Sequence, residues 1–207
     1  MFLSRIPLDV DKRETRLALN SPNIFHGSLE FCFPGERKRK LWRIDRLNGI
    51  LYLLVLSDES PDLSTFCKRF GLAENAWETK DYDVLLKRLE NGSLWRFRLT
   101  ANPTKSAAQQ DRTRGTVYAH ITTEFQRKWL LDRADKHGFQ ISEDGFDVVE
   151  SKWEKFEKSK GCKVTILSVT YEGILKITDV SSFSEVLLNG MGRGKAYGMG
   201  LLTVVHL

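Results

Sequence analysis

The sequence predicts an α+β protein in which one βαββαβ plan occurs twice. β-prone apolar runs alternate with stretches of helical spacing along the whole chain. The Asn48-Gly49 pair separates two such runs, which is a strong signal for a hairpin. The order strand, helix, strands, helix, strand then recurs in the second half. The halves share no strong sequence similarity, so the repeat lies in the order of the elements alone.

In the first half, turn and capping residues delimit the elements. Ser21 as N-cap and Pro22 at the first helical position open a second helix, and Gly71 closes a third. The two-residue period of the last strand separates an aromatic face from a face that carries arginines. The expected elements are a strand at 2–8, helices at 11–19 and 21–33, a hairpin of strands at 41–46 and 50–56, a helix at 61–70 and a strand at 94–101.

In the second half, a polar stretch marks a boundary and capping boxes mark the helices. Asn102-Pro103 ends the preceding strand, so the domain boundary is expected in the polar residues that follow. Thr123 with Gln126, and Ser182 with Glu185, have the spacing of capping boxes. The expected domains are an N-terminal one at 1–103, a basic linker at 104–115 and a C-terminal one at 116–207. The expected elements are a strand at 117–121, a helix at 123–137, strands at 139–141, 146–156 and 162–178 with a turn at Glu172-Gly173, a helix at 182–189 and a strand at 201–205.

A glycine-rich loop is expected between the last helix and the last strand. Glycine permits positive φ, and successive N–H groups in such a loop can form a concavity that binds anions. Arg193 and Lys195 add full positive charge. The spacing fits neither a Walker loop nor a dinucleotide fingerprint, so a nucleic-acid backbone is the better candidate for the anion. A tight turn with no ligand is the alternative. The five glycines are Gly190, Gly192, Gly194, Gly198 and Gly200.

The composition indicates a globular protein with a moderate basic excess. Hydrophobic residues make up 41% of the 207, which is enough for a core. The net charge of +5 makes the clustering of cations more informative than their total. Cys32, Cys67 and Cys162 lack metal or disulfide spacing and predict reduced, buried thiols. With no signal peptide and no apolar run of about 20 residues, we expect a cytoplasmic protein.

His26 is the histidine with the most informative surroundings. It lies in the second expected helix, one turn before Glu30, a spacing at which the carboxylate could favour the protonated imidazole. The alternative is a partly buried histidine with no chemical role. His120, His137 and His206 have no motif around them and are expected to be structural. No pair of histidines has metal-ligand spacing, so no metal and no cofactor are expected.

Three segments together resemble one family, the CasE-type endoribonucleases that process CRISPR precursor RNA within the type I-E Cascade complex. The stretch 188–203 resembles that family's glycine-rich loop. The stretch 97–105, FRLTANPTK, resembles a second family segment. His26-Gly-Ser-Leu29 with Phe33-Pro34 resembles the family's histidine segment. The three occur in the expected order, and the resemblance spans the whole chain.

The resemblance implies two tandem ferredoxin-like domains that bind a CRISPR repeat hairpin. It also implies metal-independent cleavage by the 2′-hydroxyl, with 5′-hydroxyl and 2′,3′-cyclic phosphate ends, by an enzyme that then stays on the guide RNA with other Cascade subunits. His26 matches the family's catalytic histidine and would act as general acid or general base. A family tyrosine maps onto Asn23. An amide cannot transfer protons usefully near neutral pH, so any help from that tyrosine is lost or comes from elsewhere.

RNA affinity is expected to come from cations that contact phosphates. Lys105, just after the Asn-Pro stop, is the first choice for a specific contact, and Arg43 is a further candidate beside the first basic run. Any single basic run is more often a solvated face. Two other functions stay open: a subunit that binds the hairpin without cutting it, and an RRM-like binder of single strands. The expected RNA-binding residues are Arg37, Lys38, Arg39, Lys40, Arg96, Arg98, Lys105, Arg112, Arg114, Lys155, Lys158, Lys160, Arg193 and Lys195.

Overall fold

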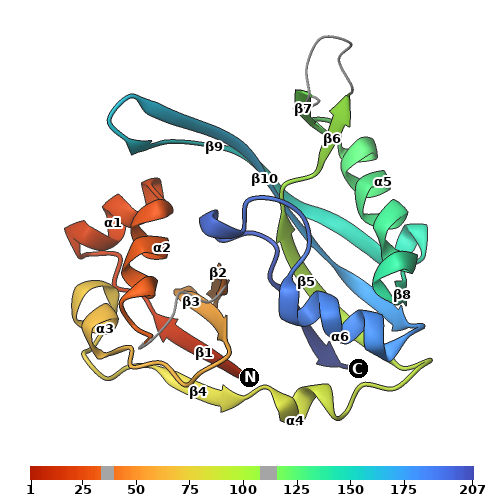
Figure 1. Ribbon diagram of the computed structural model, residues 1–207, viewed down its shortest axis with the longest axis horizontal. Coiled ribbons are helices and arrows are strands. Elements are labelled where there is room, and N and C mark those ends of the chain that lie inside the picture. The colour runs from red at the N-terminus through yellow and green to blue at the C-terminus, as the bar shows by residue number, and fades with distance from the viewer. Residues whose placement is uncertain (34–39, 108–115) are drawn as a thin grey trace.

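The computed structural model describes residues 1–33, 40–107 and 116–207 (Figure 1). The first sheet has the antiparallel order β2-β3-β1-β4. Its helices pack on one face around Phe25, Phe66 and Phe70, which are buried against the strands. The elements are β1 (Phe2–Pro7), α1 (Arg13–Asn20), α2 (Asn23–Glu30), β2 (Leu41–Leu47), β3 (Ile50–Ser57), α3 (Ser64–Phe70) and β4 (Glu78–Asp81).

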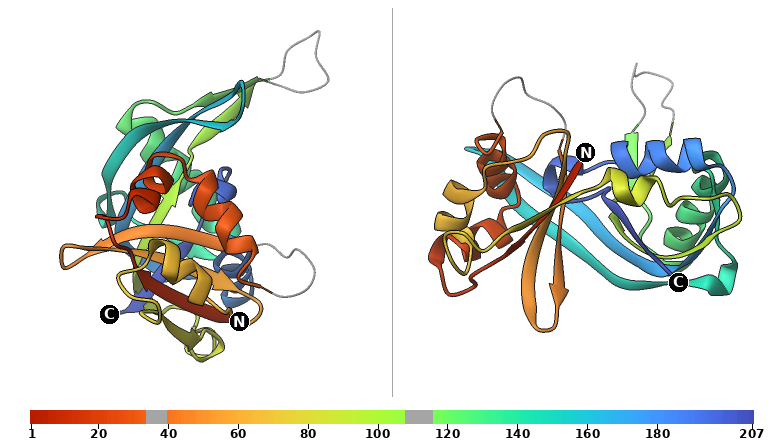
Figure 2. Two further views of the ribbon diagram at one scale, coloured as in Figure 1. Left: turned by 90° about the vertical axis from the view of Figure 1, so that its left-hand side faces the viewer. Right: turned by 90° about the horizontal axis from the view of Figure 1, so that it is seen from below.

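The second sheet has the order β11-β5-β10-β8, and β9 also pairs with β10. Its helices lie at the opposite end of the molecule from those of the first sheet (Figures 1 and 2). In both sheets the strand order is that of a ferredoxin-like fold, so the expected tandem arrangement is confirmed. The elements are β5 (Leu94–Ala101), α5 (Thr123–Ala134), β8 (Phe139–Gln140), β9 (Phe146–Ser159), β10 (Cys162–Ile177), α6 (Val180–Asn189) and β11 (Leu202–His206).

The strand β5 begins the second sheet, whereas the sequence predicts it at the end of the first. It pairs with β10 and β11. The first sheet ends instead with β4, whose sequence is Glu-Thr-Lys-Asp and whose side chains are largely exposed. Such a strand has no apolar alternation by which sequence could reveal it. The chain therefore passes from one sheet to the other through α4 (Asp83–Leu86), between β4 and β5.

The stretch expected to be a linker contains a strand. Residues 104–107 form β6 (Thr104–Ala107), which pairs with β7 (Thr116–Ala119) as a hairpin apart from both main sheets. Residues 108–115, the rest of the expected linker, lie outside the described residues. The hairpin extends from the end of the second domain that carries α5 (Figure 1).

The helix caps differ from those expected. The carboxylate of Asp179 accepts a hydrogen bond from the Ser182 N–H at 2.6 Å and caps α6. Thr122, one residue before the expected cap, accepts from the Phe125 N–H and caps α5. Ser21 makes no side-chain cap at α2. The Gln126 amide is used otherwise, because it donates to the carbonyls of the segment that enters α5.

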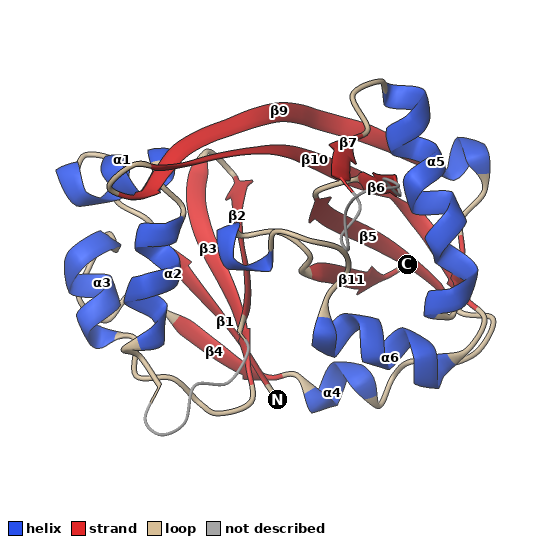
Figure 3. Cartoon of the chain, turned by 45° about the horizontal axis from the view of Figure 1, so that its top comes forward, coloured by secondary structure: helices blue, strands red, loops and turns tan. Residues whose placement is uncertain are grey.

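Strand β10 runs straight through Glu172 and Gly173, where a turn was expected. A Cβ at Gly173 would lie 2.3 Å from the Gly145 carbonyl oxygen, so glycine serves here for close approach of two backbones. Together with β9, this strand forms a long hairpin that arches from the second domain toward α1 (Figure 3). The Phe156 ring of that hairpin lies 4.9 Å from the Tyr197 ring in an edge-to-face contact.

The three cysteines are free thiols. Cys32 and Cys67 are buried as expected, and burial raises the pKa of each to about 11, so both stay protonated. Cys162 is exposed at the tip of the β9–β10 hairpin, so the expectation that it is buried is wrong. Among the described residues, no helix combines the length and apolarity needed to cross a membrane.

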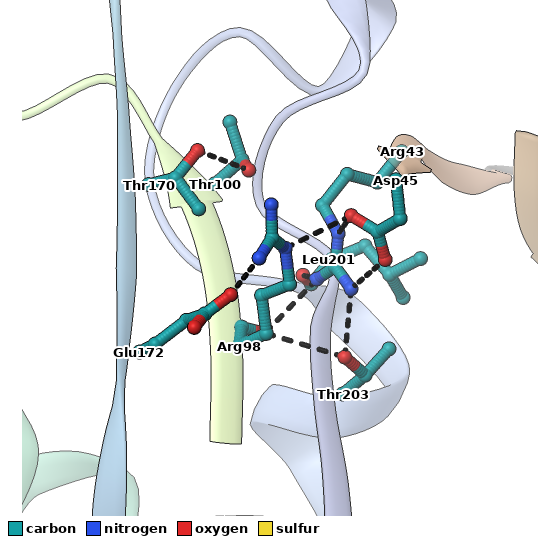
Figure 4. A network of polar contacts seen from close by, with 8 residues as sticks. All are labelled: Arg43, Asp45, Arg98, Thr100, Thr170, Glu172, Leu201 and Thr203. Carbon is teal, nitrogen blue, oxygen red and sulfur yellow. Dashed lines mark hydrogen bonds and ion pairs between the residues drawn. The ribbon is translucent and has the colours of Figure 1, made fainter. Parts of the chain in front are cut away.

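A buried arginine joins the two sheets (Figure 4). Arg43 of β2 is bidentate to Asp45, with N–O distances of 2.8 and 2.6 Å. Its remaining N–H groups donate to the carbonyls of Arg98 and Leu201 at 2.9 and 2.7 Å and to Thr203 Oγ1 at 2.8 Å. All five donors are thus used inside the protein. The expectation that Arg43 contacts RNA is wrong.

Candidate functional site

His26 lies on a helix that is fixed by its opposite face. Phe25 is fully buried, and its ring meets the rings of Trp42 and Phe70 at centroid distances of 6.0 and 5.1 Å. Leu29, one turn later, is also buried. Their neighbour His26 is partly exposed. The helix therefore presents the imidazole from a rigid support, as a catalytic group requires.

The segment from Gly190 to Gly200 folds as a loop that reaches His26's helix. A short 3₁₀ helix, η3 (Lys195–Tyr197), lies within this loop and packs against α2. All five glycines of the loop have positive φ, between 70° and 89°. The Lys195 ammonium donates to the carbonyl of Asn189 at 2.6 Å, which fixes its stem over the loop. Two motifs from opposite ends of the chain are thereby brought together.

Gly198 offers a direct test of how tightly this loop is held. Its φ is +80°, and a Cβ there would lie 2.8–3.1 Å from three atoms of the Trp42 indole. Gly198→Ala should lower the free energy of unfolding by about 1–2 kcal/mol for the positive φ and by about 1–3 kcal/mol more for the clash. Urea denaturation measures the sum of the two losses.

The matched control is Gly49→Ala in the β2–β3 turn. Gly49 has φ +82°, but a Cβ there would meet no atom within 4 Å. Gly49→Ala should therefore lose only the free energy of unfolding that comes from the positive φ. Equal losses for the two substitutions would mean that the loop can move away from Trp42 at little cost in free energy.

Glu30, one turn after His26, has a cationic neighbour. The Glu30 carboxylate lies 3.6 Å from the Lys40 ammonium. Lys40 is buried, and its ammonium sits 4.5 Å from the centre of the Phe33 ring. These contacts give Lys40 a structural role beside the His26 helix. Asn23, one turn before His26, has a buried Oδ1 with no hydrogen-bond partner in the described part of the chain.

The other expected RNA-binding cations that the structure describes fall into three groups. Lys105 and Arg193 line one hollow. Arg96 and the lysines of the β9–β10 tip, Lys155, Lys158 and Lys160, are exposed. Arg98 lies between two carboxylates, with its Nε 3.0 Å from Asp45 and its Nη1 against Glu172, so an RNA phosphate would compete with both (Figure 4). The candidates Arg37, Lys38, Arg39, Arg112 and Arg114 lie outside the described residues.

The structure adds residues that were not among the predicted site residues. Arg133 joins Lys105 and Arg193 in the same hollow, since α5 places it one turn after Trp129, with its guanidinium 4.4 Å from the indole centre. The sequence signal that could have identified Arg133 was its helical spacing from Trp129, because residues four apart lie on the same face of a helix. Phe31 is 89% exposed just after the helix that carries His26. An exposed phenylalanine cannot be told from a core one by sequence alone.

The remaining histidines have distinct surroundings. His120 lies in the hollow with Lys105 and Arg133; burial lowers its pKa, and these two cations lower it further. Burial also lowers the pKa of His137, with Lys136 adding to the effect. His206 packs edge-on against Trp95 at 4.9 Å. In the ranges 1–33, 40–107 and 116–207, no three His, Cys, Asp or Glu side chains are grouped as metal ligands.

Comparison with known proteins identifies the family. The model of the family described as "CRISPR associated protein" matches residues 1–206. The chain is 29% identical over 221 residues to the CRISPR-associated endoribonuclease Cse3 of Thermus thermophilus, covering 99% of both chains. The structure of CRISPR endoribonuclease Cse3 bound to a 19-nucleotide RNA matches with a TM-score of 0.84 and 26% identity, over 99% of this chain and 100% of that one. Thermus thermophilus Cse3 bound to an RNA that represents a pre-cleavage complex matches with a TM-score of 0.80 and 25% identity, over 99% and 98%. The chain belongs to the CRISPR-associated protein family.

Proposed function

We propose that this protein is an endoribonuclease that binds the CRISPR repeat hairpin and cleaves precursor CRISPR RNA. The observation that carries the proposal is the packing of α2, with His26, against η3 of the glycine-rich loop, with Lys195. Relatives that match over their full length are named as CRISPR endoribonucleases, and both matched structures described above hold RNA. After cleavage, the protein stays on the guide RNA as a subunit of Cascade.

Cleavage proceeds by attack of the ribose 2′-hydroxyl on the neighbouring phosphorus. The protein aligns this attack, moves protons and stabilises the extra negative charge that develops on the phosphate. Alignment alone can lower the barrier by several kcal/mol. His26 acts as general base on the 2′-hydroxyl or as general acid on the leaving 5′-oxygen. Cations of the glycine-rich loop supply electrostatic stabilisation. These steps need no metal ion.

RNA affinity comes from phosphate contacts made by exposed cations on both sides of the glycine-rich loop. Lys105 and Arg193 lie at one end of the second domain, and the lysines of the β9–β10 tip lie toward the first. An A-form stem hides its base edges in a deep, narrow major groove. The stem is therefore bound by its shape and phosphate geometry, and affinity falls steeply as salt rises.

Incubation of the protein with its repeat hairpin in EDTA tests this proposal. The expected product pair carries a 5′-hydroxyl on one fragment and a 2′,3′-cyclic phosphate on the other, because the nucleophile is internal to the RNA. Mass spectrometry of the fragments identifies both ends. Loss of cleavage in EDTA, restored by a divalent metal, would contradict the mechanism.

A second candidate function is a subunit that caps the guide-RNA hairpin without cutting it. Asn23 favours it, because an amide stands where the family has a tyrosine one turn before His26. Tight hairpin binding by the wild-type protein, with no cleavage and with equal affinity after His26→Ala, would support this function. The RRM-like binder is disfavoured because Trp95 and Phe97 face the core and are buried, whereas such binders expose aromatics on the sheet.

A further inference from the structure

A hollow of about 430 Å³ lies beside the glycine-rich loop, on the side of the second domain. It is formed where the end of β5, the β6–β7 hairpin, α5 and the loop meet. Asn102 and Arg193 are joined there by an isolated backbone bridge, which ties the loop to the end of β5. The hollow therefore has walls from four separate elements.

The charge of the hollow favours an anion. Lys105, Arg133 and Arg193 line it, and Asp132 is the carboxylate among the lining residues. Asp132 lies 3.0 Å from the Lys128 ammonium, which offsets its charge. The hollow is therefore cationic, as a phosphate group requires.

The hollow also contains a buried polar group without a partner. Asn102 is only 8% exposed, and its Oδ1 makes no hydrogen bond to any described residue. A buried amide left unsatisfied costs about 1–3 kcal/mol, so such a group indicates a ligand that completes it. A side-chain amide offers one donor group and one acceptor, the pairing that the edge of a nucleobase can match.

An aromatic surface lies at the edge of the hollow. Tyr118 of β7 is directly opposite Lys105 of β6 in the hairpin register, so the two side chains share a face. Tyr118 is 47% exposed. His120, two residues further along the same strand direction, lines the hollow itself. Exposed rings of this kind stack on bases that are not paired.

We propose that this hollow holds one unpaired nucleotide of the bound RNA, with its phosphate on Lys105 and Arg193, its base edge on the Asn102 amide and its base face beside Tyr118. The assignment rests on the proposed function and adds base readout to it. The nucleotide has to be unpaired, because a base inside an A-form stem cannot reach an amide at the bottom of a hollow. The protein thus reads one base in addition to the shape of the stem.

Binding measurements with abasic RNAs test this assignment. The repeat hairpin is prepared with a 2′-deoxyribose at the scissile position, which prevents cleavage, and with a single abasic nucleotide at each unpaired position in turn. Affinities are measured for the wild-type protein, Asn102→Ala and Tyr118→Ala. Lys87→Gln is the control, since Lys87 is exposed and lies next to α4, away from the hollow.

One abasic position is expected to weaken wild-type binding about tenfold. Asn102→Ala and Tyr118→Ala should each weaken binding of the unmodified hairpin. For the RNA that is abasic at that position, each substitution should cause little further loss of affinity. This non-additivity is the signature of a direct contact. Tyr118→Ala removes an exposed side chain, so it keeps the test valid if Asn102→Ala folds poorly. Lys87→Gln should change neither the affinity for the unmodified hairpin nor the affinity for the abasic RNA.

The phosphate contact has its own readout. Arg193→Gln should weaken binding of every RNA in the set and lower the slope of log affinity against log salt by about one. Additive losses at all abasic positions, with tight binding of the hairpin by wild type, would overturn the nucleotide assignment and leave the proposed function standing. If the wild-type protein failed to bind the hairpin at all, the proposed function would fail together with it.

Discussion

His26→Ala should slow cleavage of the repeat hairpin by about 10²–10⁴-fold, the usual contribution of a positioned acid or base. Binding should change little, because the imidazole contributes to proton transfer while phosphate contacts elsewhere hold the RNA. Single-turnover cleavage with excess enzyme measures the chemical step, and a binding assay with a 2′-deoxy RNA measures affinity separately. The substitution leaves the core of α2 intact, since Phe25 and Leu29 carry the packing.

His206→Ala is the matched control for this experiment. His206 also lies at the protein surface, but it packs against Trp95 on β5 and belongs to no motif. It should keep the wild-type cleavage rate. Full cleavage by His26→Ala would remove His26 from the mechanism, and the hairpin-capping function would then be excluded as well, because the protein would still cut.

Arg43→Ala should lower the free energy of unfolding by about 3–5 kcal/mol. The substitution removes a buried guanidinium that uses all its donors, and it leaves the carbonyls of Arg98 and Leu201 without those partners. It also leaves Asp45 paired only with Arg98 among its described contacts. Urea denaturation followed by fluorescence measures the loss. Arg43→Lys should recover only part of it, because an ammonium cannot reproduce the planar, five-donor geometry.

The control for charge alone is Arg5→Ala. Arg5 pairs with Glu78 at 2.9 Å, but both side chains are partly exposed to solvent (42% and 60%), so the loss should be about 1 kcal/mol or less. A loss of similar size for Arg43→Ala would show that the contact between the two sheets contributes little to stability. The RNA-binding role first expected of Arg43 would predict the opposite pattern, with a large loss of affinity and little loss of stability.

The parts of the fold that sequence could predict are those decided by neighbouring residues. The β2–β3 hairpin follows from Asn48-Gly49, whose positive φ values of 49° and 82° fit that turn. By contrast, β4 is four polar residues long and exists because it pairs with β1. Because β4 was not predicted, β5 was assigned to the first sheet instead of the second. The true caps, Thr122 of α5 and Asp179 of α6, lie one and three residues before those expected. In both places, neighbouring residues of types that favour the N-cap position made more than one cap possible from sequence.

The candidate site shows the same division between local and distant causes. His26 and the five glycines could be identified from their motifs. Their proximity could not, because α2 and η3 meet only after both sheets have formed. The burial of Arg43 likewise depends on Leu201 and Thr203, far along the chain, so sequence alone gave no reason to separate it from the exposed cations. Asn102 was predicted to end a strand, whereas its unpaired amide oxygen is visible only in the folded protein.

The buried arginine also constrains the order in which the protein can mature during synthesis. The first sheet emerges from the ribosome well before β11, yet Arg43 finds its last acceptors only on that strand and the residue before it. Until then the nascent N-terminal domain carries a cation with incomplete partners, and its α2 lacks the support of η3. The contacts of Arg43 and of α2 are therefore completed only in a late assembly step, once the C-terminal residues have been made.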